Sequence, residues 1–192
     1  MTVKQHLVGS GGKGLITQNA NEPIDLDYNI EIINCIKYHI DDGRSIKNYI
    51  KQQFDDLLKK YGWKPCQDST SALTTQKQNF NHANKTKFSI DLCIVRINKN
   101  GNWNRLIHQK TGNVKLDKFI WNTALKSKGL INRVDWLKKH YYWTKVREKY
   151  LEKKNMYLIK GEHNHHSFNI YIETINEIYS KYNQNKKVLT DL

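Results

Sequence analysis

The sequence predicts an α+β fold, with a mixed β-sheet core and packed helices followed by a helical C-terminal portion. Two observations predict it. Apolar and polar residues alternate over residues 24–33, as in a half-buried strand, whereas from residue 114 onward apolar residues recur at helical spacing. A chain of 192 residues is long enough to bury an apolar core. We therefore expect residues 1–112 to form the core and 113–192 the helical portion, together in one compact unit.

Several strands follow from the alternation of apolar residues. A short apolar segment at residues 3–8 runs into a glycine-rich turn. In residues 24–33 one face carries Ile24, Leu26, Tyr28, Ile30 and Ile32, and the other carries Asp25, Asp27, Asn29 and Glu31. Residues 87–97 form the strongest strand pattern, and residues 69–75 a weaker one. The turn signal at Asn100-Gly101 predicts a β-hairpin between residues 87–97 and the strand-like run after it.

Helices are predicted by apolar residues three or four positions apart. In residues 44–62 this pattern gives one helix, with Ser45 as its cap and Gly62 as its end. Apolar residues between 116 and 125 predict a second helix. An aromatic-rich segment at residues 134–154 predicts a longer one, and residues 167–182 predict the last.

The chain is strongly basic, with 32 Lys and Arg against 18 Asp and Glu and a net charge of +14. Such a charge favours an anionic partner, and nucleic acid is the obvious candidate because lysine and arginine neutralise phosphates. The abundance of Lys, Asn and Ile offers a second explanation, the codon bias of an AT-rich genome. Composition leaves both explanations open.

Cysteine usage and the lack of long apolar segments indicate the environment of the protein. Cys35, Cys66 and Cys93 are isolated, without the C-x-x-C pair of a zinc ribbon or the pattern of a disulfide framework. No segment reaches the length of a membrane span, and none has the features of a signal peptide. We expect a cytoplasmic protein with reduced thiols and no membrane partner.

The glycine-rich turn VGSGGKG, residues 8–14, satisfies the letters of a dinucleotide-binding loop. Such a loop needs a helix that starts within the glycines and an acid at the end of the next strand. Here the residues after Gly14 form a poor helix that ends near Pro23, and the acids stand at the beginning of the next strand. A Walker loop also fails, because Gly14 is followed by Leu15 rather than by Lys.

Three aspartates give a more coherent pattern. Asp25 and Asp27 are two residues apart in a strand, so their carboxylates point to the same side and can converge on a cation. Asp91 lies in the middle of the apolar strand at residues 87–97, where an unpaired carboxylate is costly without a cation or donor. Surface acids are common, but the ordered set beside a Gly-Ser turn predicts a two-metal site for phosphoryl or nucleotidyl transfer.

At these residues the sequence resembles the polymerase-beta-like nucleotidyltransferase superfamily: Gly9-Ser10, then Asp25-x-Asp27, then Asp91, in that order. The string GSGGKG is similar to the loop of the oligoadenylate and cyclic-dinucleotide synthases. The chain departs from the pattern in a long interval between Ser10 and Asp25, and it is much shorter than the oligoadenylate synthases. The resemblance covers about the first half of the chain and supports the chemistry of the superfamily more than the product of one branch.

The resemblance implies transfer of a nucleoside monophosphate from a nucleoside triphosphate to an acceptor hydroxyl. Asp25, Asp27 and Asp91 would be the catalytic residues and would bind two Mg²⁺ ions, or Mn²⁺ in their place. Gly9, Ser10 and Lys13 would bind the nucleotide phosphates.

The acceptor and any partner are less defined by the sequence. The basic charge favours RNA, such as a transfer RNA end, as in small toxin-like or end-modifying members of the superfamily. The sequence leaves open whether a protein partner such as an antitoxin is required. A small molecule such as an antibiotic, or a second nucleotide, is the alternative acceptor. A basic nucleic-acid-binding protein without catalysis is the alternative outside the enzymes.

Other clusters carry weaker signals. Lys126 and Lys128 are candidates for basic groups opposite the triphosphate. The residues Glu162, His163, His165 and His166 lack the helical spacing of a metal site, so we expect a polar connection there. The aromatic group Trp136, Tyr141, Tyr142 and Trp143 is typical of a helix core, although consecutive residues cannot all face inward and one can be open to a ligand.

Overall fold

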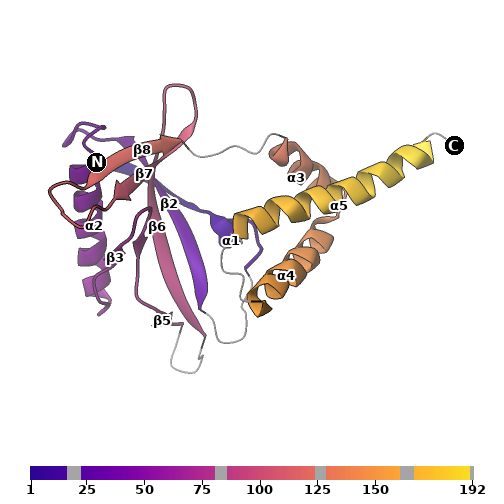
Figure 1. The fold of residues 1–192 in the computed structure, drawn as a ribbon, viewed down its shortest axis with the longest axis horizontal. Coiled ribbons are helices and arrows are strands. Elements are labelled where there is room, and N and C mark those ends of the chain that lie inside the picture. Colours follow the sequence, from indigo (N-terminus) through magenta and orange to yellow (C-terminus); the bar gives the residue numbers. More distant parts are fainter. Residues whose placement is uncertain (17–22, 81–85, 124–128, 161–166, 191–192) are drawn as a thin grey trace. The chain divides into compact units, whose positions relative to one another are not determined.

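A computed structural model of the protein describes residues 1–16, 23–80, 86–123, 129–160 and 167–190, with only the backbone for residues 158 and 184–190. The chain forms two compact units, Met1–Ala124 and Leu125–Leu192. Unit 1 contains the sheet and unit 2 the C-terminal helices (Figure 1). Among the helices in the described ranges, none is both long and apolar enough to cross a membrane.

Unit 1 is built on a mixed sheet whose central path runs β1-β2-β6-β4-β3. β5 also pairs with β6, and β7 joins β6 to β8. The two long strands β2 and β6 are parallel, and every other described pairing is antiparallel. The strands are β1 (Thr2–Leu7), β2 (Ile24–Asn34), β3 (Gln67–Asp68), β4 (Leu73–Thr74), β5 (Gln78–Asn79), β6 (Lys87–Ile97), β7 (Trp103–Gln109) and β8 (Lys118–Thr123).

Helix α2 (Gly43–Lys60) covers one face of this sheet. Its buried residues recur at four-residue steps, from Ile46 through Ile50 and Phe54 to Leu58. Each such side chain stabilises the fold by about 1.5–3 kcal/mol when it is fully buried. They pack on the apolar face of the sheet, which includes Ile32, Leu73, Ile94 and Leu106.

The ends of α2 agree with the sequence in part. Gly62 has a φ of +71°, and the amide of Trp63 donates to the Leu58 carbonyl, so the helix stops where glycine predicted. The predicted cap was wrong. Asp42 is the N-cap, and its carboxylate accepts a hydrogen bond of 3.1 Å from the backbone amide of Ser45. An aspartate at this position satisfies an amide that the helix itself leaves unpaired.

The strand predictions are largely confirmed. β6 has the expected bounds, and Gly101, with a φ of +71°, lies in the turn of the β6-β7 hairpin. The helix expected between residues 116 and 125 is wrong, because Lys118–Thr123 form strand β8 on the edge of β7. Phe119 and Trp121 are half-buried against the core while Ile120 is exposed. This period-two burial with aromatic residues favours a strand over a helix.

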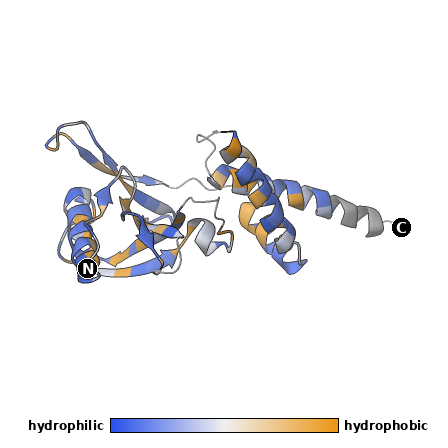
Figure 2. Ribbon diagram, turned by 90° about the horizontal axis from the view of Figure 1, so that it is seen from below, coloured by the Kyte–Doolittle hydropathy of each residue, from blue (hydrophilic) through white to orange (hydrophobic). Residues whose placement is uncertain are grey.

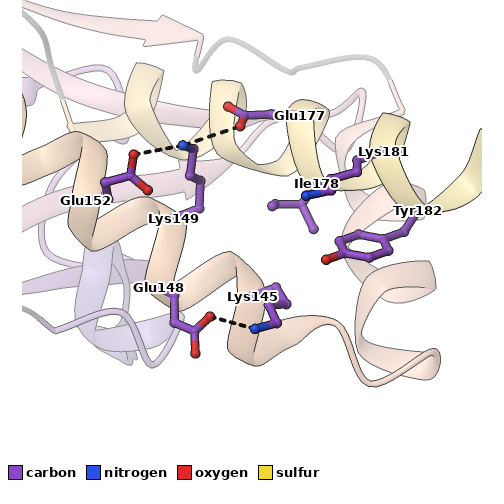
Figure 3. Close-up of a pocket in the computed structure, with 8 residues that line it drawn as sticks. All are labelled: Lys145, Glu148, Lys149, Glu152, Glu177, Ile178, Lys181 and Tyr182. Atoms are coloured by element: carbon purple, nitrogen blue, oxygen red, sulfur yellow. Dashed lines mark hydrogen bonds and ion pairs between the residues drawn. The ribbon is translucent and has the colours of Figure 1, made fainter.

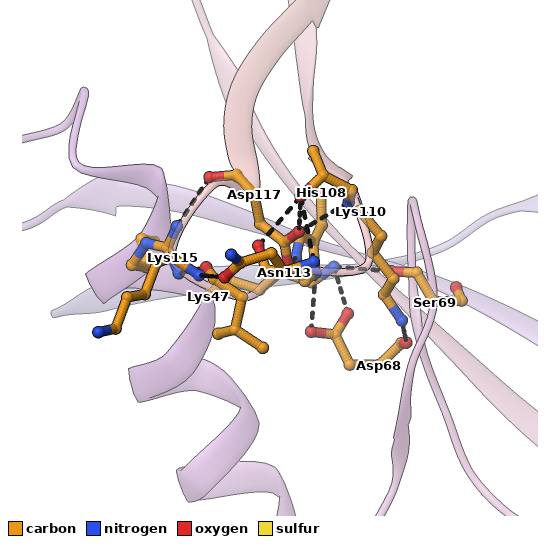
Figure 4. A network of polar contacts seen from close by, with 11 residues as sticks. Lys47, Asp68, Ser69, His108, Lys110, Asn113, Lys115 and Asp117 are labelled. Carbon is orange, nitrogen blue, oxygen red and sulfur yellow. Dashed lines mark hydrogen bonds and ion pairs between the residues drawn. The ribbon is translucent and has the colours of Figure 1, made fainter.

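A buried polar network joins α2 to the hairpin regions on the same face of the sheet (Figure 4). Lys47 is 2% exposed, and its Nζ lies 2.6 Å from Asp68 Oδ1 and donates to the Ser69 carbonyl at 2.8 Å. His108 lies between two carboxylates, with Nδ1 3.1 Å from Asp68 and Nε2 2.8 Å from Asp117. Compensation of this kind is what allows a lysine inside a core.

Unit 2 consists of helices α3 (Leu130–Lys139), α4 (Trp143–Ile159) and α5 (Ser167–Thr190). The long helix expected at residues 134–154 is therefore two helices. The break falls at Tyr141, whose φ of +63° ends α3 in a left-handed residue. Figure 2 shows apolar residues on all three helices, and the side chains that fill the unit include Leu137, Val146, Tyr150, Ile170 and Ile175.

Candidate active site

The three aspartates predicted from the sequence lie together on the face of the sheet opposite α2. Asp25 and Asp27 are on β2 at alternate positions and therefore on the same face. β6 runs parallel beside it, with Asp91 in register with Asp27 and Ser89 with Asp25. Residues paired across strands point to the same side of a sheet, so Asp91 joins the other two acids.

Two hydroxyl groups orient the outer carboxylates. The Ser89 hydroxyl donates to Asp25 Oδ1 at 2.6 Å, and the Thr74 hydroxyl, from β4, donates to Asp91 Oδ1 at 2.6 Å. The sequence indicated that a carboxylate at Asp91 needs a cation or a donor, and the Thr74 hydroxyl is such a donor. Each hydroxyl engages one oxygen and fixes the direction of the carboxylate.

The surroundings of Asp27 shift the pKa of its carboxyl. Burial raises the pKa of its carboxyl, and the negative charges of Asp91 and then Asp25 raise it further. The positive charges of Lys13 and Arg105 act in the opposite direction. Carboxylates gathered in this way repel one another unless a cation lies among them.

The glycine-rich turn lies directly on this site. Gly9–Gly12 form a single helical turn, α1, and the amide of Val8 donates to the Asp27 carbonyl at 2.8 Å. Gly9 has a φ of +60°, and a Cβ placed on it would stand only 1.9 Å from Asp27 Oδ2. Only glycine combines this backbone conformation with this approach to the carboxylate.

The start of the turn offers hydrogen-bond donors. Within the part of the chain that the structure describes, the backbone amides of Gly9, Ser10 and Gly11 donate to no acceptor, whereas those from Gly12 to Leu15 close the turn. Lys13 folds back over it, and its Nζ donates to the Gly9 carbonyl at 3.1 Å. Burial lowers the pKa of Lys13, while the charge of Asp27 raises it. Consecutive unpaired amides beside a lysine form a concavity suited to anions.

The three carboxylates do not by themselves form a complete metal site. Across the described ranges, no group of three or more His, Cys, Asp or Glu side chains is placed so that it could hold a metal ion. Magnesium is usually bound by one or two carboxylates together with substrate phosphates and water, not by a full protein cage. Asp25, Asp27 and Asp91 on one open face supply such carboxylates.

Sequence reasoning missed three residues on this face: Thr74, Ser89 and Arg105. Ser89 stands two positions before Asp91 in the same strand, so the alternation could have placed it beside the acids. Arg105 faces the same side because it pairs with Val95, which is in register with Glu31. Nothing local to Thr74 indicates its contact with Asp91, since β4 has only two residues.

The remaining sequence candidates lie elsewhere. Lys126 and Lys128, and the cluster from Glu162 to His166, fall outside the described residues. Two residues of the aromatic group predicted in unit 2, Trp136 and Tyr142, are half-buried and take part in a stack of rings. Trp136 stacks on His140 at 4.2 Å, and Tyr142 stacks on Tyr182 at 4.2 Å and on Trp136 at 5.8 Å, as measured between ring centroids.

Comparison with known proteins addresses the fold. No protein-family model and no curated protein matches the sequence. A solved structure that resembles the chain is the Elizabethkingia meningoseptica CdnE cyclic dinucleotide synthase with GTP and Apcpp, with a TM-score of 0.50 and 14% sequence identity. The match covers 91% of this chain and 61% of that one, so the chain spans about three fifths of the synthase's length.

This likeness defines the class of the fold. The protein has an α+β nucleotidyltransferase-like fold, with a mixed sheet, packed helices and C-terminal helices. The sequence-based expectation of the fold class is confirmed.

Proposed function

We propose that the protein is a magnesium-dependent nucleotidyltransferase that transfers a nucleoside monophosphate from a nucleoside triphosphate to an acceptor hydroxyl. The observation that carries the proposal is the convergence of Asp25, Asp27 and Asp91 on one face of the sheet, beneath a turn that Gly9 brings against Asp27. The likeness to a cyclic dinucleotide synthase supports it at the level of fold.

The residues divide into two groups by chemistry. Asp25, Asp27 and Asp91 would hold two Mg²⁺ ions, or Mn²⁺, which when bound neutralise phosphate charge and favour ionisation of the acceptor hydroxyl. The amides of Gly9 and Ser10, the Ser10 hydroxyl and the Lys13 ammonium bind the terminal phosphates of the donor.

The reaction is an in-line displacement at the α-phosphorus. The acceptor oxygen forms a bond to that phosphorus, the bond from it to the bridging oxygen breaks, and pyrophosphate leaves. Asp91, held by Thr74, orients the acceptor hydroxyl and takes up its proton. Asp25, held by Ser89, and Asp27 lie on the side of the donor.

We infer that the acceptor is RNA, such as a transfer RNA end. The net charge of +14 supports this, as do the aromatic rings of unit 2, two of which have a cation above them. Lys138 Nζ lies 4.8 Å from the Trp143 ring centroid, and Arg133 lies 5.7 Å from that of Tyr179. The proposal also allows a protein partner such as an antitoxin.

The second candidate acceptor is a nucleotide. One observation favours it, the likeness to a synthase of cyclic dinucleotides. Mass spectrometry separates the two: an added nucleotide on RNA supports the first, and a dinucleotide formed from triphosphates alone supports the second.

The test of catalysis is transfer of label. The protein is incubated with α-labelled nucleoside triphosphates, Mg²⁺ and an RNA pool, beside Asp27→Asn and, as a matched control, Asp56→Asn, which alters an exposed acid on α2. We expect product from the wild type and from Asp56→Asn and none from Asp27→Asn. Equal labelling by Asp27→Asn removes the site assignment. RNA binding that depends on salt but is indifferent to Mg²⁺ and nucleotides, without product, supports the non-catalytic alternative.

A further inference from the structure

The face that carries the aspartates continues beyond them along the same strands. On β2 the alternation runs from Asp27 through Asn29 to Glu31, and Glu31 is in register with Val95 of β6. Val95 pairs in turn with Arg105 of β7, and Trp103 follows two positions away on the same side. A polar strip therefore leads from the acids toward the start of β7.

Arg105 is the positively charged side chain that β7 places on this strip. Among the described residues its guanidinium makes no hydrogen bond or ion pair, although it is only half-exposed. The acid in its row, Glu31, is already engaged, because its carboxylate lies 2.7 Å from His6 Nε2. A half-buried arginine without a hydrogen bond or ion pair to the described residues can present its planar fork of donors to an anion from outside the chain.

The charge of Arg105 reaches the proposed catalytic centre. Its positive charge interacts with Asp27 and with Cys93, the residue between the acids and Val95 on β6. Arg105 stands four residues along the strand from the Asp27 row, about 13 Å at the rise of a strand, and its side chain spans part of that distance. The distance left between the Arg105 guanidinium and the aspartates is comparable to the distance between the 3′-hydroxyl and the 5′-phosphate of one nucleotide.

Trp103 extends the strip by one further step. Two residues of a strand span about 7 Å, similar to the spacing of successive nucleotides in an extended chain. The Trp103 ring is half-exposed and is held by His6, whose ring meets it edge to face with centroids 5.4 Å apart. An aromatic ring at this distance from a phosphate-binding arginine is suited to stack on a base.

We propose that Arg105 binds the phosphate of the acceptor nucleotide whose hydroxyl lies at Asp91, and that Trp103 stacks on the base before it when the acceptor is a strand. This inference rests on the proposed function and adds to it a second anion site, separate from the donor site at the glycine turn. The ligand is a nucleotide that bears a 5′-phosphate, either free or as the last residue of an RNA.

The first test measures binding without catalysis. In EDTA and without triphosphate, AMP and the dinucleotide pApA are titrated into wild type, Arg105→Ala, Arg105→Lys and Lys99→Ala by calorimetry. Lys99→Ala removes one exposed positive charge from the turn of the same hairpin. We expect Arg105→Ala to weaken binding about tenfold or more, Arg105→Lys to recover part of it, and Lys99→Ala to change it less than about twofold. Absence of wild-type binding, or equal binding by Arg105→Ala, overturns the assignment.

The second test separates this inference from the proposed function. If the wild type transfers label, Arg105→Ala should raise the KM for the acceptor and leave the KM for the triphosphate unchanged. An equal rise in both KM values assigns Arg105 to the donor and overturns the inference. If the wild type transfers no label, the proposed function fails, while the titration in EDTA still decides whether Arg105 binds phosphate.

Trp103→Ala distinguishes the two sources of the ligand. Weaker binding of pApA with unchanged binding of AMP indicates the end of an RNA. Unchanged binding of both indicates a free nucleotide and overturns the role given to Trp103.

Discussion

Gly9 and Asp27 are in such close contact that no side chain fits between them: a Cβ on Gly9 would lie 1.9 Å from Asp27 Oδ2. The two residues are 18 positions apart in the sequence. The hydrogen bond from the Val8 amide to the Asp27 carbonyl fixes their approach. The turn and the carboxylate therefore form one structural element, and the identity of Gly9 is tied to the position of Asp27.

Gly9→Ala is expected to disable the site. The alanine must adopt a left-handed conformation, which costs about 1–2 kcal/mol, and its methyl group displaces the Asp27 carboxylate. A displacement near 1 Å lowers the transfer rate about a hundredfold. Gly14→Ala is the control, because Gly14 has a φ of +65° but open space around a Cβ. It should lose similar backbone stability in thermal unfolding and retain transfer activity; equal activity of the two variants would contradict the contact.

Lys47→Ala is expected to destabilise unit 1 by about 3 kcal/mol, because it leaves Asp68 and the Ser69 carbonyl without their buried donor. Urea-induced unfolding measures the change. The control is Lys51→Ala on the same helix, where a more exposed lysine pairs with Asp55. In that variant the free energy of unfolding should fall by less than about 1 kcal/mol. Equal losses for the two variants would mean that the network in Figure 4 contributes no more than a surface pair.

Glu177→Gln should remove a pH-dependent contribution to the stability of unit 2. The hydrogen bond from Lys153 lowers the pKa of Glu177, and Lys149 adds to the effect; Lys149 lies beside Glu177 in the shallow pocket between α4 and α5 (Figure 3). Because the folded pKa is lowered, the contribution is present above the unfolded value near 4.5 and is lost as the pH falls through the folded pKa.

Glu177 is 44% exposed on its side chain, so solvent screening keeps its contribution below about 1 kcal/mol. Wild type and variant are compared by urea unfolding at pH 7 and pH 3. The wild type should be the more stable at pH 7, and the difference should shrink at pH 3. A difference that stays constant with pH would exclude the ion pair as its cause.

Thiol reactivity tests the packing of the sheet. Burial raises the pKa of Cys66 to about 12 and also raises that of Cys93, and both side chains are buried. Cys35 is only half-buried. At pH 8 a disulfide reagent should modify Cys35 first and the other two after denaturation, because the thiolate is the reactive form. The fast phase should vanish in Cys35→Ser; a fast phase that persists would place another thiol at the surface.

Prediction from the sequence succeeded where a local period decides the structure. Apolar and polar residues alternate over most of β2, β6 is a long apolar run, and apolar residues recur at four-residue steps in α2, so these elements were predicted closely. The predictions were wrong at residues whose conformation depends on contacts with distant parts of the chain. Residues 118–123 carry apolar residues that suit a helix or a strand, and the edge of β7 selects the strand. Tyr141 carries no local signal for the left-handed conformation that divides α3 from α4.

By itself the sequence determined that Asp25 and Asp27 share a face, because side chains two apart in a strand point the same way. It also determined that Asp91 lies in the middle of an apolar strand. Only the tertiary structure decided that Asp91 is in register with Asp27. It also placed Thr74 and Ser89 so that their hydroxyls orient the carboxylates, and Arg105 on the same face of the sheet. Register between strands distant in sequence arises from packing of the whole sheet, which no local pattern encodes.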